Sequence, residues 1–327
     1  MLLGGPESEP FAKQSSAVKD TYNFTVFMVP DEEYPNAVIT DFAALKAKLG
    51  KKSPIKRIGL VGVNEMPHAV YVRLAEGFND AELIDITGDY LKLRYVKSAW
   101  EIEQAKKATR LSFRAYKAMK ARVRPGVKEI AVAAAGESVC RRGGANGFAY
   151  QTIVGSGARS NAVVPTATDK VMETGETVML GIAPRINGYA GTFGHTVPVS
   201  GDYTAEQRKY LTDMVGVLRD VKAQLKPGAI GKDIDKAGRN LYLKGGYLKY
   251  IVCPFAHTMG LMEAEAPFFG SNSDDVLRPN MLVNVDVSFF GHPTLNGVRV
   301  ETCYVITKDG AEALCPEMEN ELLKILG

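Results

Sequence analysis

The segment Arg94-Tyr95-Val96-Lys97-Ser98-Ala99-Trp100-Glu101-Ile102 marks a change in the pattern of the chain. Ser98 and Glu101 have the S-x-x-E spacing of a capping box, in which each side chain accepts a hydrogen bond from the other residue's backbone N–H. From Ile102 onward, apolar and small residues recur at helical spacing. The pattern ends at Pro125-Gly126, a pair that stops a helix. We therefore expect one long helix that begins after Ser98 and ends before Pro125.

The residues before this helix, 1–93, alternate apolar runs with short helical stretches. Residues 24–29 and 58–63 are rich in apolar residues and predict strands, and residues 40–49 predict a helix between them. This alternation is typical of a small α/β unit.

The residues after it predict a second kind of domain. Helices are expected at 128–140, 204–225 and 231–244. Strands are expected at 178–183, 189–199, 281–290 and 297–307, with a further one around Ile251. The first two strands are joined by residues 184–188, which look like a hairpin connection. The fold class that follows is α+β, with an antiparallel sheet and helices on one face.

Composition excludes several classes of protein. The 327 residues carry a formal net charge of only +3, which is too small for a dedicated nucleic-acid binder. No apolar run is long enough for a membrane span and no signal peptide is evident, so we expect a cytoplasmic protein. The four cysteines are far apart, which favours reduced thiols. Cys253 precedes His257 by four residues, but Pro254 argues against a helix that would pair them.

The segment at 94–102 resembles the R-x-x-K-S-x-x-E-I entry to the catalytic domain of the creatinase/aminopeptidase P/prolidase family, M24. Further segments similar to motifs of that family follow in the same order: R-P-G-V-K-E at 124–129, I-V-G-S-G at 153–157, N-A-V-V-P at 161–165, the strand pair at 175–189, H-T-M-G-L-M-E-A-E-A-P at 257–267 and G-V-R-V-E at 297–301. The resemblance implies a pita-bread catalytic domain at 94–327. It also implies a short, partial creatinase-type N-terminal α/β domain at 1–93.

The resemblance also shows what this chain lacks. Peptidases of the family hold two divalent metals with two Asp, one His and two Glu. The two Asp positions are Gly181 and Thr192 here, while His257, Asp286 and Glu301 stand at the other three. Two nearby divalent ions repel each other and need bridging carboxylates, so we expect no dinuclear metal site and no metal cofactor. A single divalent ion on the three remaining residues is the alternative.

The histidines that handle protons in the family are absent too, since Thr166 and Ala264 stand at their positions. His195 replaces a usual arginine and could substitute for a lost base. However, residues 192 and 195 point to opposite faces of a regular strand, so only a bulge would turn His195 inward. We predict His257, Asp286 and Glu301 as catalytic residues.

Substrate-binding residues are expected among Arg299, Glu265, Thr192 and His195. Strand alternation supports such a pocket, because Asp286 shares a face with Asn284 and Ser288, and Glu301 with Arg299 and Cys303.

Three functions remain open for such a site. The first is a metal-independent creatinase/prolidase-like hydrolase or lyase that acts on a C–N bond of a small nitrogen-containing substrate. In it, His257 is the general acid/base, Asp286 and Glu301 orient substrate or water, and Arg299 binds a carboxylate. The second is a non-catalytic binding module, a pseudoenzyme. The third is a mononuclear Xaa-Pro peptidase-like metallohydrolase. The expected partners are a small-molecule substrate and, by resemblance, a second copy of the chain in a homodimer; no nucleic acid or membrane is expected.

Overall fold

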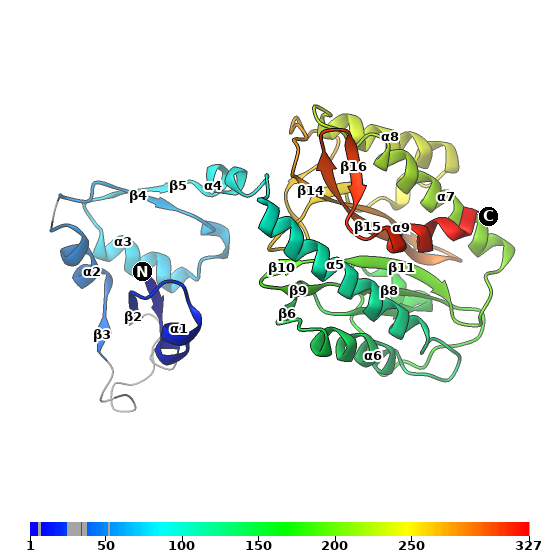
Figure 1. Ribbon diagram of the computed structural model, residues 1–327, viewed down its shortest axis with the longest axis horizontal. Coiled ribbons are helices and arrows are strands. Elements are labelled where there is room, and N and C mark those ends of the chain that lie inside the picture. The colour runs from blue at the N-terminus through cyan, green and yellow to red at the C-terminus, as the bar shows by residue number, and fades with distance from the viewer. Residues whose placement is uncertain (6–7, 25–33, 35–37, 52, 327) are drawn as a thin grey trace. The chain divides into compact units, whose positions relative to one another are not determined.

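The computed structural model describes residues 1–5, 8–24, 34, 38–51 and 53–326 (Figure 1). The chain divides into two compact units, Met1–Lys92 and Leu93–Gly327. Among the described residues, no helix combines the length and the apolar character that crossing a bilayer requires. Each unit has its own hydrophobic core, so each is described by itself.

In its described residues, the first unit contains short parallel strands and four α-helices. Its strands are β1 (Leu2–Gly4), β2 (Thr21–Phe24), β3 (Ile39–Thr40), β4 (Arg57–Leu60) and β5 (Glu82–Asp85), and its helices are α1 (Glu9–Ser15), α2 (Phe42–Leu49), α3 (His68–Gly77) and α4 (Thr87–Leu93). The strands form a three-stranded sheet, β1-β2-β3, and a pair, β4-β5. The Asp41 carboxylate caps α2 by accepting a hydrogen bond from the Ala44 N–H at 2.7 Å.

The predicted elements of this unit are partly matched. The helix expected at 40–49 is α2, and the strand expected at 58–63 is the shorter β4. Of the strand expected at 24–29, Phe24 ends β2, and residues 25–29 lie outside the described part of the chain.

The second unit is built on an antiparallel sheet. Its path is β13-β12-β14-β15-β11-β8-β7, and β16 pairs with β15. The strands are β7 (Ile153–Ser156), β8 (Thr177–Ile182), β11 (Phe193–Pro198), β12 (Ala256–Thr258), β13 (Glu265–Phe268), β14 (Leu282–His292), β15 (Asn296–Thr307) and β16 (Gly310–Ala313). A separate small sheet contains three short strands of the same unit, β6 (Gly147–Phe148), β9 (Pro184–Ile186) and β10 (Tyr189–Ala190). The long strands β14 and β15 pair over most of their length and form the middle of the sheet.

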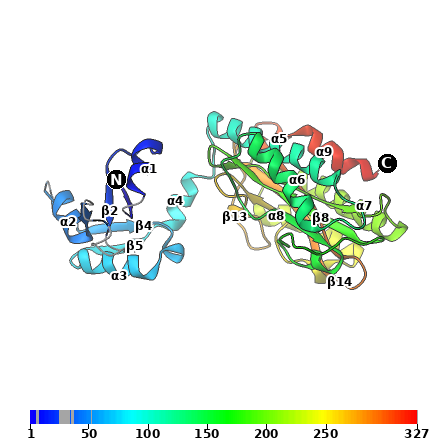
Figure 2. The same ribbon diagram turned by 90° about the horizontal axis from the view of Figure 1, so that it is seen from below.

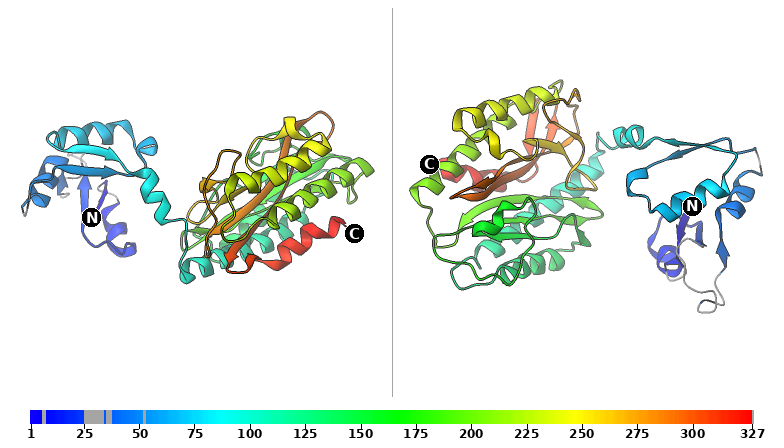
Figure 3. Two further views of the ribbon diagram at one scale, coloured as in Figure 1. Left: turned by 90° about the horizontal axis from the view of Figure 1, so that it is seen from above. Right: turned by 180° about the vertical axis from the view of Figure 1, so that it is seen from behind.

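The long helices of this unit pack against one face of the sheet. They are α5 (Ala99–Lys120), α6 (Glu129–Arg142), α7 (Ala205–Lys222), α8 (Gly231–Gly245) and α9 (Pro316–Leu323). Figure 2 shows α5, α6 and α9 along the same side, and the view from behind in Figure 3 shows the strands in front of α5. The α+β architecture with helices on one face, expected from the sequence, is confirmed.

The capping box at the start of α5 is also confirmed. The Ser98 N–H donates to Glu101 Oε2 at 2.7 Å, and the Glu101 N–H donates to Ser98 Oγ at 3.3 Å. One expected strand is wrong, because the chain around Ile251 follows a 3₁₀ turn at Leu248–Tyr250 and the next strand is β12.

The core of the second unit lies between the helices and the sheet. Tyr116 and Met119 of α5 are buried against Phe193 of β11 and Leu180 of β8. Each such side chain stabilises the fold by roughly 1.5–3 kcal/mol when it leaves water. The opposite face of the sheet is therefore left to the polar residues described next.

Candidate active site

Strand pairing brings the predicted catalytic residues to one face of the sheet. Asp286 of β14 lies directly opposite Glu301 of β15, and Glu301 in turn lies opposite Gly194 of β11. His257 of β12 lies opposite Asn284 of β14. Residues that are directly paired in an antiparallel sheet point to the same face. The pairing thus places His257, Asn284, Asp286 and Glu301 together.

His195 lies on the other face of the same sheet. It is paired with Val300, one residue away from Glu301, so its side chain points towards the helices. His195 Nδ1 is 2.8 Å from the Tyr116 hydroxyl of α5. Burial lowers the pKa of His195 to about 3, which keeps the ring neutral. His195 is therefore part of the helix–sheet core, as strand alternation suggests, and does not join the catalytic residues.

A hydrogen-bonded group, which we call the polar centre, consists of Thr192, His257, Glu263, Asn284 and Glu301. The Asn284 amide Nδ2 is 2.6 Å from Glu301 Oε1, 2.9 Å from Glu263 Oε1 and 3.3 Å from His257 Nε2. The Thr192 hydroxyl donates to Glu301 Oε1 at 3.1 Å. An amide nitrogen, which can only donate, thus lies between three acceptors.

The imidazole of His257 has a defined tautomer. Its Nδ1 is 3.0 Å from the carbonyl oxygen of Thr258, which can only accept, so Nδ1 carries the proton. The lone pair of the neutral ring is therefore on Nε2, the atom that faces Asn284 and Glu263. A nitrogen held in this way is suited to accept a proton from water or substrate.

Glu263 is the functional candidate that sequence reasoning missed. It lies in the loop between β12 and β13, next to Ala264, and its Oε1 is 3.5 Å from His257 Nε2. Burial, together with the negative charge of Asp286, raises its pKa, and burial likewise raises the pKa of Glu301. A loop position gives no periodic pattern from which its direction could be predicted. The only available signal was an acidic residue inside the 257–267 segment.

Asp286 and Arg299 form a buried ion pair beside the polar centre. Arg299 Nε is 3.2 Å from Asp286 Oδ1, and the two side chains are only 6% and 10% exposed. Burial alone would lower the pKa of Arg299, but the carboxyls of Asp286 and Glu301 keep it above its usual value. The charge of Asp286 is thus already balanced by a cation of the protein.

The donor set does not fit two divalent ions. Gly181 supplies no ligand, and a side chain there would meet Ile153 Cδ1 at 3.1 Å and the Tyr150 hydroxyl at 3.3 Å. Tyr150 also lies 2.7 Å from Thr192 Oγ1, so the space is filled by hydrogen-bonded protein groups. The Asn284 amide lies between the carboxyls of Glu263 and Glu301 and donates to both. Among the residues that the structure describes, no three His, Cys, Asp or Glu are grouped to hold a metal ion.

Glu265 has a different environment from Glu263. Its carboxylate is paired with Arg94 and, at 3.0 Å, with Lys97 Nζ. Lys97 is almost fully buried, and burial lowers its pKa although Glu265 opposes the shift. Glu265 therefore holds the start of β13 to the segment before α5, which fixes one end of the loop that carries Glu263.

The Cys253 thiol is a poor nucleophile in this structure. Cys253 Sγ lies 3.8 Å from Ser288 Oγ, and burial together with Asp286 raises its pKa to about 12. A thiolate is therefore strongly disfavoured near neutral pH.

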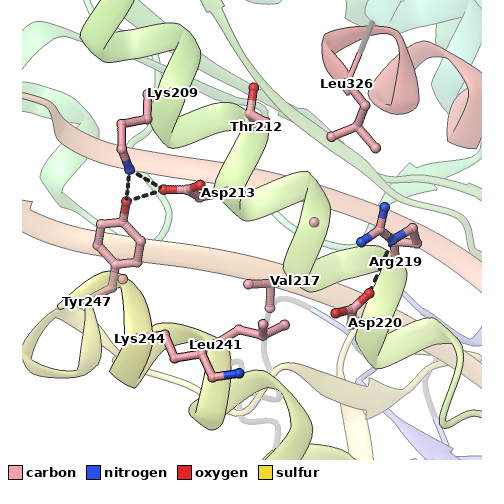
Figure 4. A pocket seen from close by; sticks show the side chains of 12 residues that line it. Lys209, Thr212, Asp213, Val217, Arg219, Asp220, Leu241, Lys244, Tyr247 and Leu326 are labelled. Atoms are coloured by element: carbon pink, nitrogen blue, oxygen red, sulfur yellow. Dashed lines mark hydrogen bonds and ion pairs between the residues drawn. The ribbon is translucent and has the colours of Figure 1, made fainter.

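Cavities of this unit also lie away from the polar centre. One, of about 420 Å³, is lined by Thr166 and by Tyr150, whose hydroxyl contacts the polar centre through Thr192. Another, of about 490 Å³, lies between α7 and α8 (Figure 4). In it, Lys209 is paired with Asp213 and Arg219 with Asp220, so its charges largely cancel. None of the residues of the polar centre lines either cavity.

Comparison with known proteins places this geometry in context. Residues 103–308 match the sequence profile described as metallopeptidase family M24. The uncharacterized peptidase YqhT of Bacillus subtilis is 32% identical over 260 residues, which are 78% of this chain and 72% of that protein. The Xaa-Pro dipeptidase of Pyrococcus horikoshii is 27% identical over 301 residues, 90% of this chain and 84% of that protein.

Solved structures resemble most of this chain. The X-Pro aminopeptidase of Thermotoga maritima superposes with a TM-score of 0.82 at 25% identity, covering 95% of this chain and 82% of that one. The prolidase of P. horikoshii superposes with a TM-score of 0.78 at 26% identity, covering 87% and 83%. The similarity therefore extends over most of both chains in each comparison.

Proposed function

Because the chain belongs to metallopeptidase family M24, we propose that it is a prolidase-like hydrolase that has lost the dinuclear metal centre. Its substrate is a small nitrogen-containing compound, and the bond broken is a C–N bond. Relatives named as Xaa-Pro dipeptidases support the substrate class, since they act on small molecules of this kind.

The observation that carries this proposal is the position of Asn284. Its amide donates to Glu301 and lies within hydrogen-bonding distance of Glu263 and His257. A protein N–H group thus satisfies the oxygens that a cation would otherwise bind, and Arg299 does the same for Asp286. In the proposed reaction, the side chains of the site supply the proton transfers.

The roles follow from the contacts. His257 Nε2 accepts a proton from water, and Glu301 and Thr192 orient the reacting groups by hydrogen bonds. Asp286 holds Arg299, and the N–H groups of Arg299 that Asp286 leaves free bind a carboxylate of the substrate. The proposal gives Glu265 and His195 no role in binding substrate. Glu265 is held in its ion pair with Lys97, and His195 contacts Tyr116 in the helix–sheet core.

A substrate screen with the full chain tests the proposal. Protein purified without chelator is incubated with Xaa-Pro dipeptides, cyclic amides, betaines and guanidino compounds, and metal content per chain is measured in parallel. We expect cleavage of one class with a negligible ion content, no gain from added manganese, iron or zinc, and loss of activity in His257→Ala. Activity that appears only with one bound ion per chain would favour the mononuclear metallohydrolase instead.

A non-catalytic binding module is the second candidate, and one observation favours it. The hydrogen bonds of Thr192, Asn284 and Glu301 are satisfied within the protein, as they would be in a site that no longer reacts. In that case wild type and His257→Ala are equally inert, and a compound of the panel raises the melting temperature. Sedimentation of the same sample tests the homodimer that the family resemblance predicts.

A further inference from the structure

We propose that Glu263 is a further catalytic residue, which donates the proton that the leaving nitrogen needs when the C–N bond breaks. This role rests on the proposed function, since it concerns the same site. Glu263 lies in a loop and directly precedes Ala264, the position at which the family motif has a histidine.

The position of Glu263 is suited to contact a substrate. Its side chain is 17% exposed, compared with 9% for His257 and 10% for Asp286. Its Oε1 is nevertheless fixed by the Asn284 amide at 2.9 Å. Glu263 is thus both the most accessible of these acid–base groups and held in one direction.

Charged groups from three strands surround Glu263. It faces Asp286 of β14 and Glu301 of β15, which are negative when ionised, and Arg299 of β15, which is already paired with Asp286. His257 Nε2 of β12 lies 3.5 Å from Glu263 Oε1, and its Nδ1 is bound to the Thr258 carbonyl oxygen. Burial and the charge of Asp286 raise the pKa of Glu263, whereas Arg299 and the hydrogen bonds to Glu301 and Asn284 lower it. The contact of Glu263 Oε1 with His257 Nε2 is the path by which Glu263 gains the proton that it donates.

The reaction balances with the groups present. Water attacks the carbon of the C–N bond, and His257 Nε2 accepts one proton of that water. Glu263 gives its proton to the nitrogen, which leaves with the bonding electron pair, so an amide substrate gives a carboxylic acid and an amine. The proton on His257 then returns to Glu263 Oε1 across the 3.5 Å contact, and both groups regain their starting state.

Glu263→Gln tests this role, because glutamine keeps the shape and an oxygen acceptor but has no acidic proton. The compound class that wild type cleaves is prepared in two forms, with an alkyl group and with a p-nitrophenyl group on the leaving nitrogen. We expect kcat for the alkyl form to fall about 100-fold or more, with KM nearly unchanged. The electron-withdrawing p-nitrophenyl group makes departure of the nitrogen depend less on proton donation, so the loss for this form is about tenfold or less.

Two further variants make the result decisive. Glu312→Gln, an exposed glutamate of β16, is the control and leaves both rates unchanged. Glu263→Asp, which keeps an acid at the site, recovers part of the alkyl rate even if Glu263→Gln lowers the melting temperature. An equal loss with both leaving groups, or no loss, overturns the role of Glu263 while the proposed hydrolase stands. A wild type that cleaves no compound of the panel overturns both.

Discussion

Asn284 determines the character of the polar centre at the scale of single residues. It is fully buried, and its amide lies within hydrogen-bonding reach of the two glutamates and His257. An aspartate or glutamate there would bring a third carboxyl against Glu263 and Glu301. The neutral amide instead lets the acidic groups approach one another without a cation.

Replacing Asn284 by alanine removes the donor and leaves buried acceptors without a partner. We expect Asn284→Ala to lower the free energy of unfolding by roughly 1–3 kcal/mol, the usual cost of a stranded buried polar group. Urea unfolding measures the change. Asn320→Ala on the exposed side of α9 is the matched control and should change stability little. Unchanged stability in Asn284→Ala would mean that the amide is not needed to satisfy the carboxyls.

At the scale of elements, β11 shows how one strand serves two purposes. Gly194 faces Glu301, and any side chain there would meet Glu301 Oε2 at 2.6 Å and Arg299 Cδ at 2.8 Å. The neighbouring residues Phe193 and His195 pack against Tyr116 of α5 on the other face. The alternation of one strand therefore separates the polar centre from the helix–sheet core.

The buried His195 predicts a dependence of stability on pH. Its pKa is about 3 in the folded chain and near 6.5 when exposed. Between these values the unfolded chain binds a proton that the folded chain does not, so stability falls as the pH drops from about 6.5 towards 3. His195→Gln, which can still bond to Tyr116, should show a shallower decline in thermal melting, whereas exposed His68→Gln should match wild type. Identical pH profiles for all three proteins would contradict this assignment.

At the scale of the whole molecule, the second unit has the pita-bread fold, as the sequence predicts and as the M24 structures show. The predicted domains are residues 1–93 and 94–327, and the compact units of the structure meet at Lys92 and Leu93. The polar centre and the residues that hold it all belong to the second unit.

We propose that residues 93–327 fold without the first unit, because their core is separate from that of residues 1–92. Expressed alone, this fragment should unfold in one cooperative transition and keep the far-ultraviolet circular dichroism of its helices. Limited proteolysis of the full chain should yield a stable fragment that begins close to Leu93. A fragment that is molten or aggregated would show that the two units depend on each other.

The sequence by itself determined the sheet-and-helix architecture of the second unit and the capping box of α5. Through the family resemblance it also predicted that Gly181 and Thr192 stand where the family's peptidases have aspartates. These features depend on local periodicity and on the order of motifs, which a linear sequence records. Strand alternation also indicated that His195 would point to the opposite face from Thr192. The strand expected around Ile251 failed, because a short apolar run there forms a 3₁₀ turn instead.

Only the tertiary structure decided how the remaining polar residues meet. Glu263 reaches the polar centre from a loop, whose direction no periodicity predicts, and Asn284 donates to side chains 17 and 21 residues away in the sequence. Glu265, two residues from Glu263, is drawn instead to Arg94 and Lys97. These contacts depend on which charged groups lie near one another once the strands have paired. A buried charge is costly unless a partner lies beside it in the folded chain.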